Sequence, residues 1–250
     1  MEKTKGFSAQ QLKLIAIIAM TVDHLLWVIF PGYGKAWWLV ALHSIGRLSA
    51  PIMCFFISEG YHYTKNIKQY LLRLFLFAIV GHFAYNFAFG IPFLPFGKGE
   101  VFNQTSVMWA LFLGAAALLI CDDRNEKLPS WAKIAGFLLC CLLAFPADWS
   151  CIAVLVIAVF YFNRGHFKKQ MLWMLACVFL YAAVYFLFID RIYGVLQLAV
   201  VLCVPFLSRY NGTRGKGGKW FFYWYYPAHL MICGLLRLAL HGNISVMIGG

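Results

Sequence analysis

Long apolar runs, interrupted only by short polar stretches, occupy almost the entire chain. We expect nine of these runs to be helices, and most approach the roughly 20 apolar residues that a transmembrane helix needs. The expected helices cover residues 12–30, 36–60, 69–90, 105–121, 131–146, 150–162, 171–189, 192–208 and 220–241. The pattern predicts an all-α fold, a polytopic integral membrane helical bundle with about nine transmembrane helices.

The middle of the chain leaves the number of transmembrane helices open between eight and ten. The sixth expected helix is short, and only Asp190 and Arg191 separate the seventh from the eighth. The connecting loops are all short, and neither an internal repeat nor a soluble domain interrupts the series. We therefore expect one transmembrane domain over residues 1–250.

The composition indicates the same class of protein. Hydrophobic residues make up 63% of the chain and charged residues only 12%, and the mean hydropathy is +0.76. A soluble domain carries about twice that share of charged residues. The 8 cysteines lie mostly within apolar runs and form no CxxC pair, so we expect small core residues rather than disulfides or metal ligands.

The net charge of +12 would suggest a nucleic-acid partner in a soluble protein, but basic cytoplasmic loops explain it in a membrane protein. If the N-terminus is cytoplasmic, the opposite side of the membrane receives few loop cations, namely Lys35, Lys98 and Arg191. This asymmetry predicts a cytoplasmic N-terminus and no nucleic-acid partner. We expect a multi-pass protein of a bacterial cytoplasmic (inner) membrane.

The first expected helix carries three ionisable side chains, Lys13 near its start and Asp23 and His24 in its interior. Such groups are costly at membrane depth unless they are paired or line a cavity, so they indicate a functional site. The positions of Lys13 and His24 place them about 20° apart around the helix and roughly 16 Å apart along it. A surface cation and a buried imidazole therefore share one face, separated by about the reach of a phosphopantetheine arm.

Other expected helices bring polar side chains to similar depths. Arg47 lies close to the depth of His24 and needs an anionic partner, for which Asp23 is the expected choice. His43 lies one turn from Arg47 on the same face. Further polar groups, at depth, at the cytoplasmic rim or beside Pro227, are Glu59, His82, Asn86, Tyr226 and His229. A single histidine in an apolar helix is more often a hydrogen-bonded structural group, so that role stays open for these histidines.

Three separate motifs resemble the TraX family of membrane proteins. They are LKLIAIIAMTVDH, IGRLSAPIMCFFISEGYHYTKN with YLLRL soon after it, and FYWYYPAHL. The resemblance implies a transmembrane acyltransferase-like domain, because the founding member is associated with acetylation of the N-terminus of conjugative pilin. The family is similar to the acyltransferase-3 group, in which Arg or Lys, ten residues and then His mark the first catalytic helix. That pattern falls here on Lys13 and His24.

The resemblance and the polar pattern together predict an enzyme that moves an acetyl group from cytoplasmic acetyl-CoA to an acceptor amine or hydroxyl at or across the membrane. We expect His24 to be the general base, Asp23 to pair with Arg47, and Arg47 or Tyr226 to stabilise the oxyanion. The expected phosphate-binding residues are Lys13, Lys65, Arg73, Arg214, Lys216 and Lys219. The expected acceptor-binding residues are His43, Glu59, His82, Asn86, Tyr226 and His229.

The sequence leaves the acceptor open among a pilin-like peptide, a cell-surface glycan and a lipid. It also does not decide whether the acetyl group is transferred directly or through an acetyl-histidine intermediate. One alternative function is a b-type haem or metal protein, in which facing helices hold paired histidines. Its candidate ligands are His24, His82 and His229. Another is a proton-coupled transporter. Its candidate relay is Asp23, Glu59 and Arg47. A third is a non-enzymatic assembly factor, although buried ionisable groups are costly to keep in a scaffold.

Overall fold

The computed structural model describes residues 6–94, 102–122 and 128–246; Lys98 and the side chain of Lys219 lie outside this part. The described residues form helices, with two isolated β-bridges between loops. The helices are α1 (Ala9–Ile29), α2 (Trp37–Gly46), α3 (Ser49–Tyr63), α4 (Ile67–Phe89), α5 (Val107–Cys121), α6 (Ser130–Ala144), α7 (Ser150–Phe162), α8 (Phe167–Phe188), α9 (Arg191–Gln197), a 3₁₀ helix (Leu198–Cys203), α10 (Val204–Leu207) and α11 (Lys219–His241).

The prediction of one unbroken helix over residues 36–60 is wrong, because the backbone turns at Arg47 and Leu48 between α2 and α3. The amide of Leu48 bonds to the carbonyl of Ile45, three residues back instead of four. Pro51 explains the break, since it has no N–H for the Arg47 carbonyl and its ring crowds that carbonyl. The turn leaves Arg47 at the end of α2, where its side chain reaches α1.

The predicted helix over residues 192–208 is also divided, into α9, the 3₁₀ helix and α10. Pro205 lies at the start of α10 and cannot donate to the carbonyl of Val201. That carbonyl accepts instead from the amide of Val204, which is the tighter bond of a 3₁₀ helix. The other seven predicted ranges each contain one helix, with ends shifted by a few residues.

Four segments of the described chain are long and apolar enough to cross a bilayer. They are Ala9–Ile29, Trp37–Tyr63, Ile67–Phe89 and Phe167–Phe188. Shorter apolar helices occupy Val107–Cys121, Ser130–Ala144, Ser150–Phe162 and Arg191–Leu207. These helices have the composition of a membrane helical bundle, while the number of nine spans stays a prediction.

The chain divides into two compact units. Unit 1 comprises Met1–Met53, Phe87–Gly90 and Met174–Gly250, and unit 2 comprises Cys54–Asn86 and Ile91–Trp173. Helices α3, α4 and α8 therefore each contribute residues to both units.

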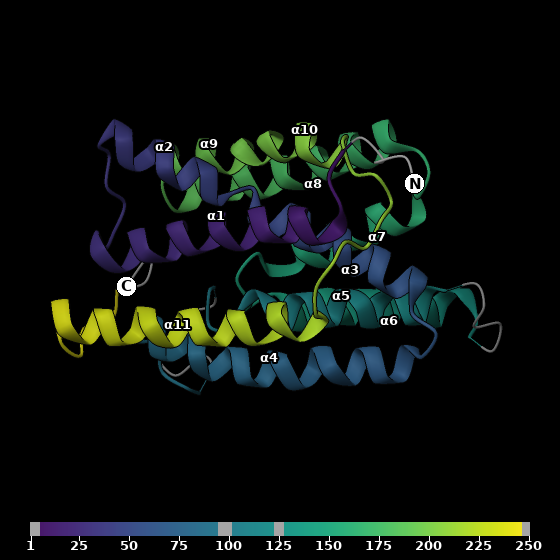
Figure 1. The fold of residues 1–250 in the computed structure, drawn as a ribbon, viewed down its shortest axis with the longest axis horizontal. Helices are drawn as coiled ribbons and strands as arrows, with labels where there is room; N and C mark the ends of the chain where they lie inside the picture. Colours follow the sequence, from purple (N-terminus) through teal and green to yellow (C-terminus); the bar gives the residue numbers. More distant parts are fainter. Residues whose placement is uncertain (1–5, 95–101, 123–127, 247–250) are drawn as a thin grey trace. The chain divides into compact units, whose positions relative to one another are not determined.

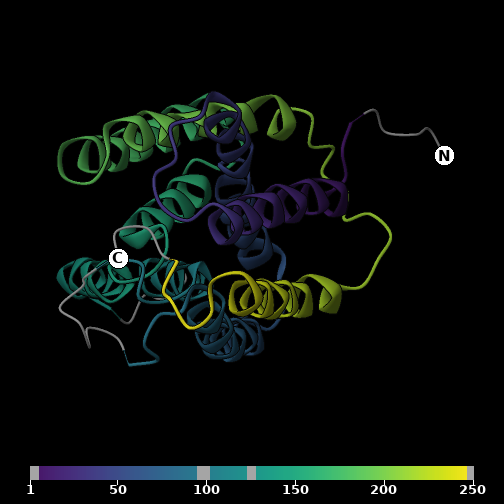
Figure 2. The same ribbon diagram turned by 90° about the vertical axis from the view of Figure 1, so that its left-hand side faces the viewer.

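In unit 1, α1 lies between α2 and α11 (Figure 1). Helices α1 and α11 run in the same direction, because Thr21 contacts Tyr225 and, further along both helices, the carbonyl of Val28 accepts from His241. Figure 2, which turns the molecule by 90°, again shows α11 beside α1. The polar positions of the first and last expected helices are thus brought together.

The N-terminus of α1 is fixed by its own cap and by the segment that precedes α11. Ser8 and Gln11 form a capping box, in which the Ser8 side chain accepts from the Gln11 amide. The carbonyl of Thr213 accepts from the amide of Ala9 at 2.8 Å, and the carbonyl of Arg214 accepts from the next amide. The first N–H groups of α1, which have no partner inside the helix, are satisfied in this way.

Unit 2 is built around α5, α6 and α7, each of which packs against the other two. Tyr61 on α3 donates to the carboxylate of Asp122 at the end of α5, at 3.0 Å. Arg164 donates to Glu59 at 2.8 Å and also to the hydroxyl of Tyr63. These polar contacts tie α3 to the ends of α5 and α7 within the unit.

Candidate functional site

A buried carboxylate on α1 is held by two side chains of the α2 region. One oxygen of Asp23 accepts from Nη2 of Arg47 at 2.6 Å, and the other is 2.7 Å from Nδ1 of His43. Both Asp23 and His43 are buried. Arg47 also donates to the amide oxygen of Gln197 on α9, at 3.3 Å. The expected pairing of Asp23 with Arg47 is confirmed.

Close contact between α1 and α2 brings these groups together, and it depends on a glycine. A Cβ atom added to Gly46 would lie 2.5 Å from the Cβ of Asp23 and 2.6 Å from its Oδ1. Any larger residue at this position would therefore collide with the carboxylate. Gly46 is the last residue of α2, immediately before the turn that positions Arg47.

Three aromatic rings, those of Trp27, Tyr33 and Tyr193, line the His43 side of this cluster. Trp27 lies 4.5 Å from His43 and 5.4 Å from Tyr193, and Tyr33 lies 4.8 Å from Tyr193, measured between ring centroids. The hydroxyl of Tyr193 donates to the carbonyl of Gly34. Nε2 of His43 and the hydroxyl of Tyr33 are buried and have no hydrogen-bond partner among the described residues. Burial, followed by the neighbouring phenols and Asp190, raises the pKa of Tyr33.

A pair of histidines occupies the opposite interface of α1, against α11. Nδ1 of His24 lies 2.9 Å from Nε2 of His229, and the two ring planes differ by only 9°. Both residues are buried. Nδ1 of His229 lies 3.1 Å from the backbone carbonyl of Tyr225, while Phe89 packs edge-on against His24. Nε2 of His24 has no hydrogen-bond partner within the described ranges.

Lys13 lies on the same side of α1 as His24. Its ammonium lies 5.8 Å from the centre of the Phe222 ring, and Phe222 is about two turns before His229 on α11. Both Lys13 and His24 therefore face α11 and share one face of α1, and only the shared face is predicted from their spacing. The Arg214 guanidinium is close enough to repel the Lys13 ammonium.

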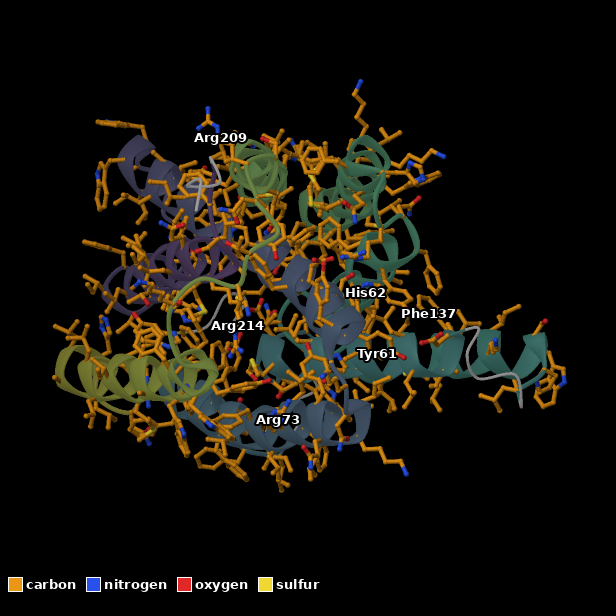
Figure 3. The ribbon with its side chains drawn as sticks, turned by 45° about the vertical axis from the view of Figure 1, so that its right-hand side comes forward. Tyr61, His62, Arg73, Phe137, Arg209 and Arg214 are labelled. Atoms are coloured by element: carbon orange, nitrogen blue, oxygen red, sulfur yellow. The ribbon has the colours of Figure 1, made fainter. Side chains whose placement is uncertain are left out.

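Basic side chains gather on the segment between α10 and α11. Figure 3 labels Arg209 and Arg214 on this segment, and Lys216 follows; all three are exposed. The glycines between them allow the chain to turn, since Gly212, Gly215 and Gly217 have positive φ angles. The expected phosphate-binding residues of unit 1 thus share one end of α1.

Among the remaining predicted site residues, Tyr226 belongs to unit 1, where it is buried and its ring centroid lies 5.4 Å from that of His229. The others belong to unit 2, where each has its own neighbours. Both nitrogens of His82 are engaged, with the Thr105 hydroxyl at 2.9 Å and the Phe93 carbonyl at 2.8 Å. The amide of Asn86 donates to the carbonyl of Pro92 at 2.7 Å. These bonds give His82 and Asn86 structural partners. The other residues predicted from the sequence are Glu59, paired as described, Lys65, which is exposed, and Arg73, which is partly exposed.

The polar contacts that sequence reasoning missed in unit 1 include those of Arg237, Gln197 and Tyr225. Arg237 on α11 is buried and donates to the carbonyls of Phe87 and Ile244. Gln197 reaches Arg47, and Tyr225 reaches the Thr21 hydroxyl at 2.8 Å. Arg237 and Gln197 could have been found, because each is a single strongly polar residue within an apolar run.

Comparison with known proteins places the chain in a family. A family model described as "TraX protein" matches residues 8–237. A relative from Dichelobacter nodosus, described as "Probable fimbrial assembly protein FimC, serogroup H1", is 33% identical over 248 residues, covering 93% of this chain and 96% of the relative. No solved structure matches the chain.

Proposed function

The chain belongs to the TraX family, and on that premise we propose that it is a membrane-embedded acetyltransferase. The donor is acetyl-CoA from the cytoplasm, and the acceptor is an amine or hydroxyl at or across the membrane. The TraX family is associated with pilin acetylation, and the relative is named as a fimbrial assembly protein, so a pilin-like peptide is the first acceptor to test.

One observation carries the proposal. A buried histidine on α1 keeps Nε2 without a hydrogen-bond partner in the described chain, and a lysine lies on the same face of α1 about three turns nearer its start. An imidazole with an available nitrogen can accept a proton, and a cation at the helix start can bind phosphate. The two groups are spaced along one helix as the thioester and the nucleotide of acetyl-CoA are spaced along one molecule.

The basic end of α1 supports a polyanionic ligand. Lys13 and Arg214 repel each other, and a phosphate group between them would convert this repulsion into attraction on both sides. Lys216 and, by its position in the sequence, Lys219 add positive charge on the same segment. Lys65 and Arg73 belong to unit 2, and their role in phosphate binding stays a prediction from the sequence.

In the proposed reaction, His24 takes the acceptor's proton at Nε2 while the acceptor attacks the carbonyl carbon of the thioester. The new bond to the acceptor forms, the C–S bond breaks, and coenzyme A leaves as a thiolate that receives the proton. Arg47 or Tyr226 stabilises the oxyanion during attack. The acceptor-binding role of His43 stays a prediction from the sequence: its Nε2 has no partner among the described residues, and its side chain is fully buried.

The proposed location is a bacterial cytoplasmic membrane, which the chain crosses several times with its N-terminus in the cytoplasm. This orientation places the start of α1 and the 209–219 segment on the side where acetyl-CoA is present.

Calorimetric titration of acetyl-CoA into the detergent-purified protein tests the donor. We expect binding by the wild type and by His24→Ala, and binding about tenfold or more weaker for Lys13→Ala, because a hydrogen bond to a charged group contributes about 1.5–3 kcal/mol. Lys169→Ala is the matched control, since this lysine is exposed and lies in unit 2. Absence of binding by the wild type would exclude acetyl-CoA as the donor. An absorption spectrum would then test the haem alternative.

Transfer is measured with a peptide that has a free N-terminal amine, alongside the same peptide with that amine blocked. Mass spectrometry should detect an added acetyl group only on the free peptide. Equal acetylation of both peptides would exclude the amine as the acceptor.

A further inference from the structure

We infer that His229 is the positioning residue of the proposed catalytic base: it fixes His24 in the tautomer that leaves Nε2 unprotonated. A general base needs an available lone pair that faces its substrate, and in a histidine the hydrogen bond at the other ring nitrogen decides which nitrogen that is. This inference rests on the proposed function for its catalytic consequence, but the tautomer itself can be measured independently.

The neighbouring carboxylate cannot take this role. Asp23 precedes His24 directly, so the two side chains project about 100° apart on the helix. Both oxygens of Asp23 also have partners already, Arg47 and His43. Nδ1 of His24 lies instead 2.9 Å from the imidazole of His229 on α11. The group that orients His24 therefore comes from the other end of the chain.

The hydrogen bonds from Tyr225 through His229 to His24 contain one group that can only accept a hydrogen, and this group determines both tautomers. The Tyr225 carbonyl has no proton to give, so Nδ1 of His229 carries the hydrogen of that bond. A neutral His229 then has a bare Nε2, which must accept from Nδ1–H of His24. A neutral His24 with its proton on Nδ1 has its lone pair on Nε2. The backbone of α11 thus determines the tautomer of a side chain on α1.

The same bond can disperse the charge that forms during transfer. When Nε2 of His24 takes the acceptor's proton, the ring becomes an imidazolium whose Nδ1–H still points at a lone pair of His229. If that Nδ1 proton moves to His229, His24 becomes neutral again with its proton on Nε2, and His229 donates from both nitrogens. The proton returns from His229 to Nδ1 of His24 before Nε2–H protonates the thiolate of coenzyme A, so the original pair is restored and protons and charge balance.

The rival interpretation is a structural contact between two helices without any effect on the tautomer. The chain offers a matched control for it. His241, also on α11, donates through Nε2 to the Val28 carbonyl of α1 at 2.8 Å. This bond also links α1 to α11 but does not involve His24. Loss of His241 should therefore lower stability without changing the state of His24.

The decisive experiment is ¹⁵N NMR of detergent-solubilised protein labelled at its 7 histidines, with the signals of His24 and His229 assigned from their own variants. We expect His24 in the Nδ1–H tautomer in the wild type. His229→Gln should keep this tautomer, because the Gln side-chain oxygen can accept from Nδ1–H. His229→Leu should lose it, and His241→Leu should leave it unchanged. A wild-type His24 with its proton on Nε2, or a tautomer that does not respond to His229→Leu, would overturn the inference.

Acetyl transfer to the free-amine peptide supplies the second readout. His229→Leu should reduce transfer on the order of 10²-fold, as expected when a general base is misdirected, while acetyl-CoA binding stays as in the wild type. His229→Gln should recover most of this loss, and His241→Leu should transfer normally. Equal losses of transfer in the Leu and Gln variants would show that a hydrogen-bond acceptor at position 229 is not required, and this result would overturn the inference. If the wild type acetylates no peptide amine, the proposed function fails for that acceptor and the catalytic role of His229 fails with it, whatever the NMR shows.

Discussion

The Arg47 guanidinium donates a 2.6 Å hydrogen bond to the Asp23 carboxylate, across the interface between α2 and α1. Both side chains are largely removed from solvent, with 11% of each exposed. Nδ1 of His43 is hydrogen-bonded to the other carboxylate oxygen. An ion pair in such a place is costly to break, because removal of one member leaves the other charge buried without compensation.

Single replacements in this pair should be strongly destabilising. We expect Asp23→Ala and Arg47→Ala each to lower the free energy of unfolding by about 3–5 kcal/mol, and the double variant to lose less than the sum. Chemical unfolding in detergent measures all three. The matched comparison is Glu59 with Arg164, whose arginine side chain is 34% exposed and for which we expect a coupling of about 1 kcal/mol or less. Equal coupling energies in the two pairs would contradict this account of burial.

Replacement of the proposed base should separate catalysis from binding. We expect His24→Ala to reduce acetyl transfer by about 10²–10⁴-fold, the usual contribution of a general base, while acetyl-CoA binding changes little. The measurement is the initial rate of peptide acetylation at saturating acetyl-CoA. His166→Ala is the control, since this histidine is exposed on the loop between α7 and α8. Retained transfer by His24→Ala would reject His24 as the base.

The sequence predicts local features of the site well, because helical periodicity and charge compensation act over short distances. The shared face of Lys13 and His24 follows from 3.6 residues per turn. The partnership of Asp23 with Arg47 follows from the need of a deep cation for an anion. Neither argument requires knowledge of which helices are neighbours beyond the first two.

The sequence does not predict the contact between His24 and His229, which are separated by 205 positions. Periodicity identifies the polar face of a helix but not the helix that covers it. The break before α3 had a visible signal in Pro51, but proline is also tolerated in the first turn of a helix, so the sequence alone does not locate the turn at Arg47. The position of Arg47 against α1 therefore depends on tertiary packing.

The buried hydroxyl of Tyr33 leads to a prediction about how stability depends on pH. Its oxygen has no hydrogen-bond partner in the described part of the chain, so Tyr33→Phe should raise the free energy of unfolding by about 1 kcal/mol at neutral pH. Folding also raises the pKa of this phenol, mainly through burial. The unfolded chain therefore loses this proton first, above about pH 10, and the wild type loses stability there as pH rises. The advantage of Tyr33→Phe should consequently grow in alkaline solution.

Tyr193→Phe is the control for Tyr33, because it removes a hydroxyl from the same ring cluster that does have a partner. Loss of its bond to the Gly34 carbonyl should cost about 1 kcal/mol at neutral pH. Unfolding curves at neutral and alkaline pH compare the two variants. A destabilised Tyr33→Phe would mean that its hydroxyl makes a stabilising contact in the folded protein.

Gly46 tests whether the contact between α1 and α2 positions the Asp23 carboxylate. The Cβ of Gly46→Ala would meet the Asp23 side chain at 2.5–2.6 Å, so either the carboxylate or the helix must move. We expect a loss of about 1–3 kcal/mol in the free energy of unfolding, the usual cost of overpacking, together with a loss of acetyl transfer. Gly218→Ala is the control, because no atom lies within 4 Å of the Cβ it would add. The two helix-facing interfaces of α1 can then be distinguished: Gly46→Ala should disturb the bonds of Asp23 to Arg47 and His43 but leave the His24 tautomer as in the wild type. Unchanged stability together with unchanged transfer in Gly46→Ala would contradict this account, because the Asp23 carboxylate would then tolerate the added methyl group.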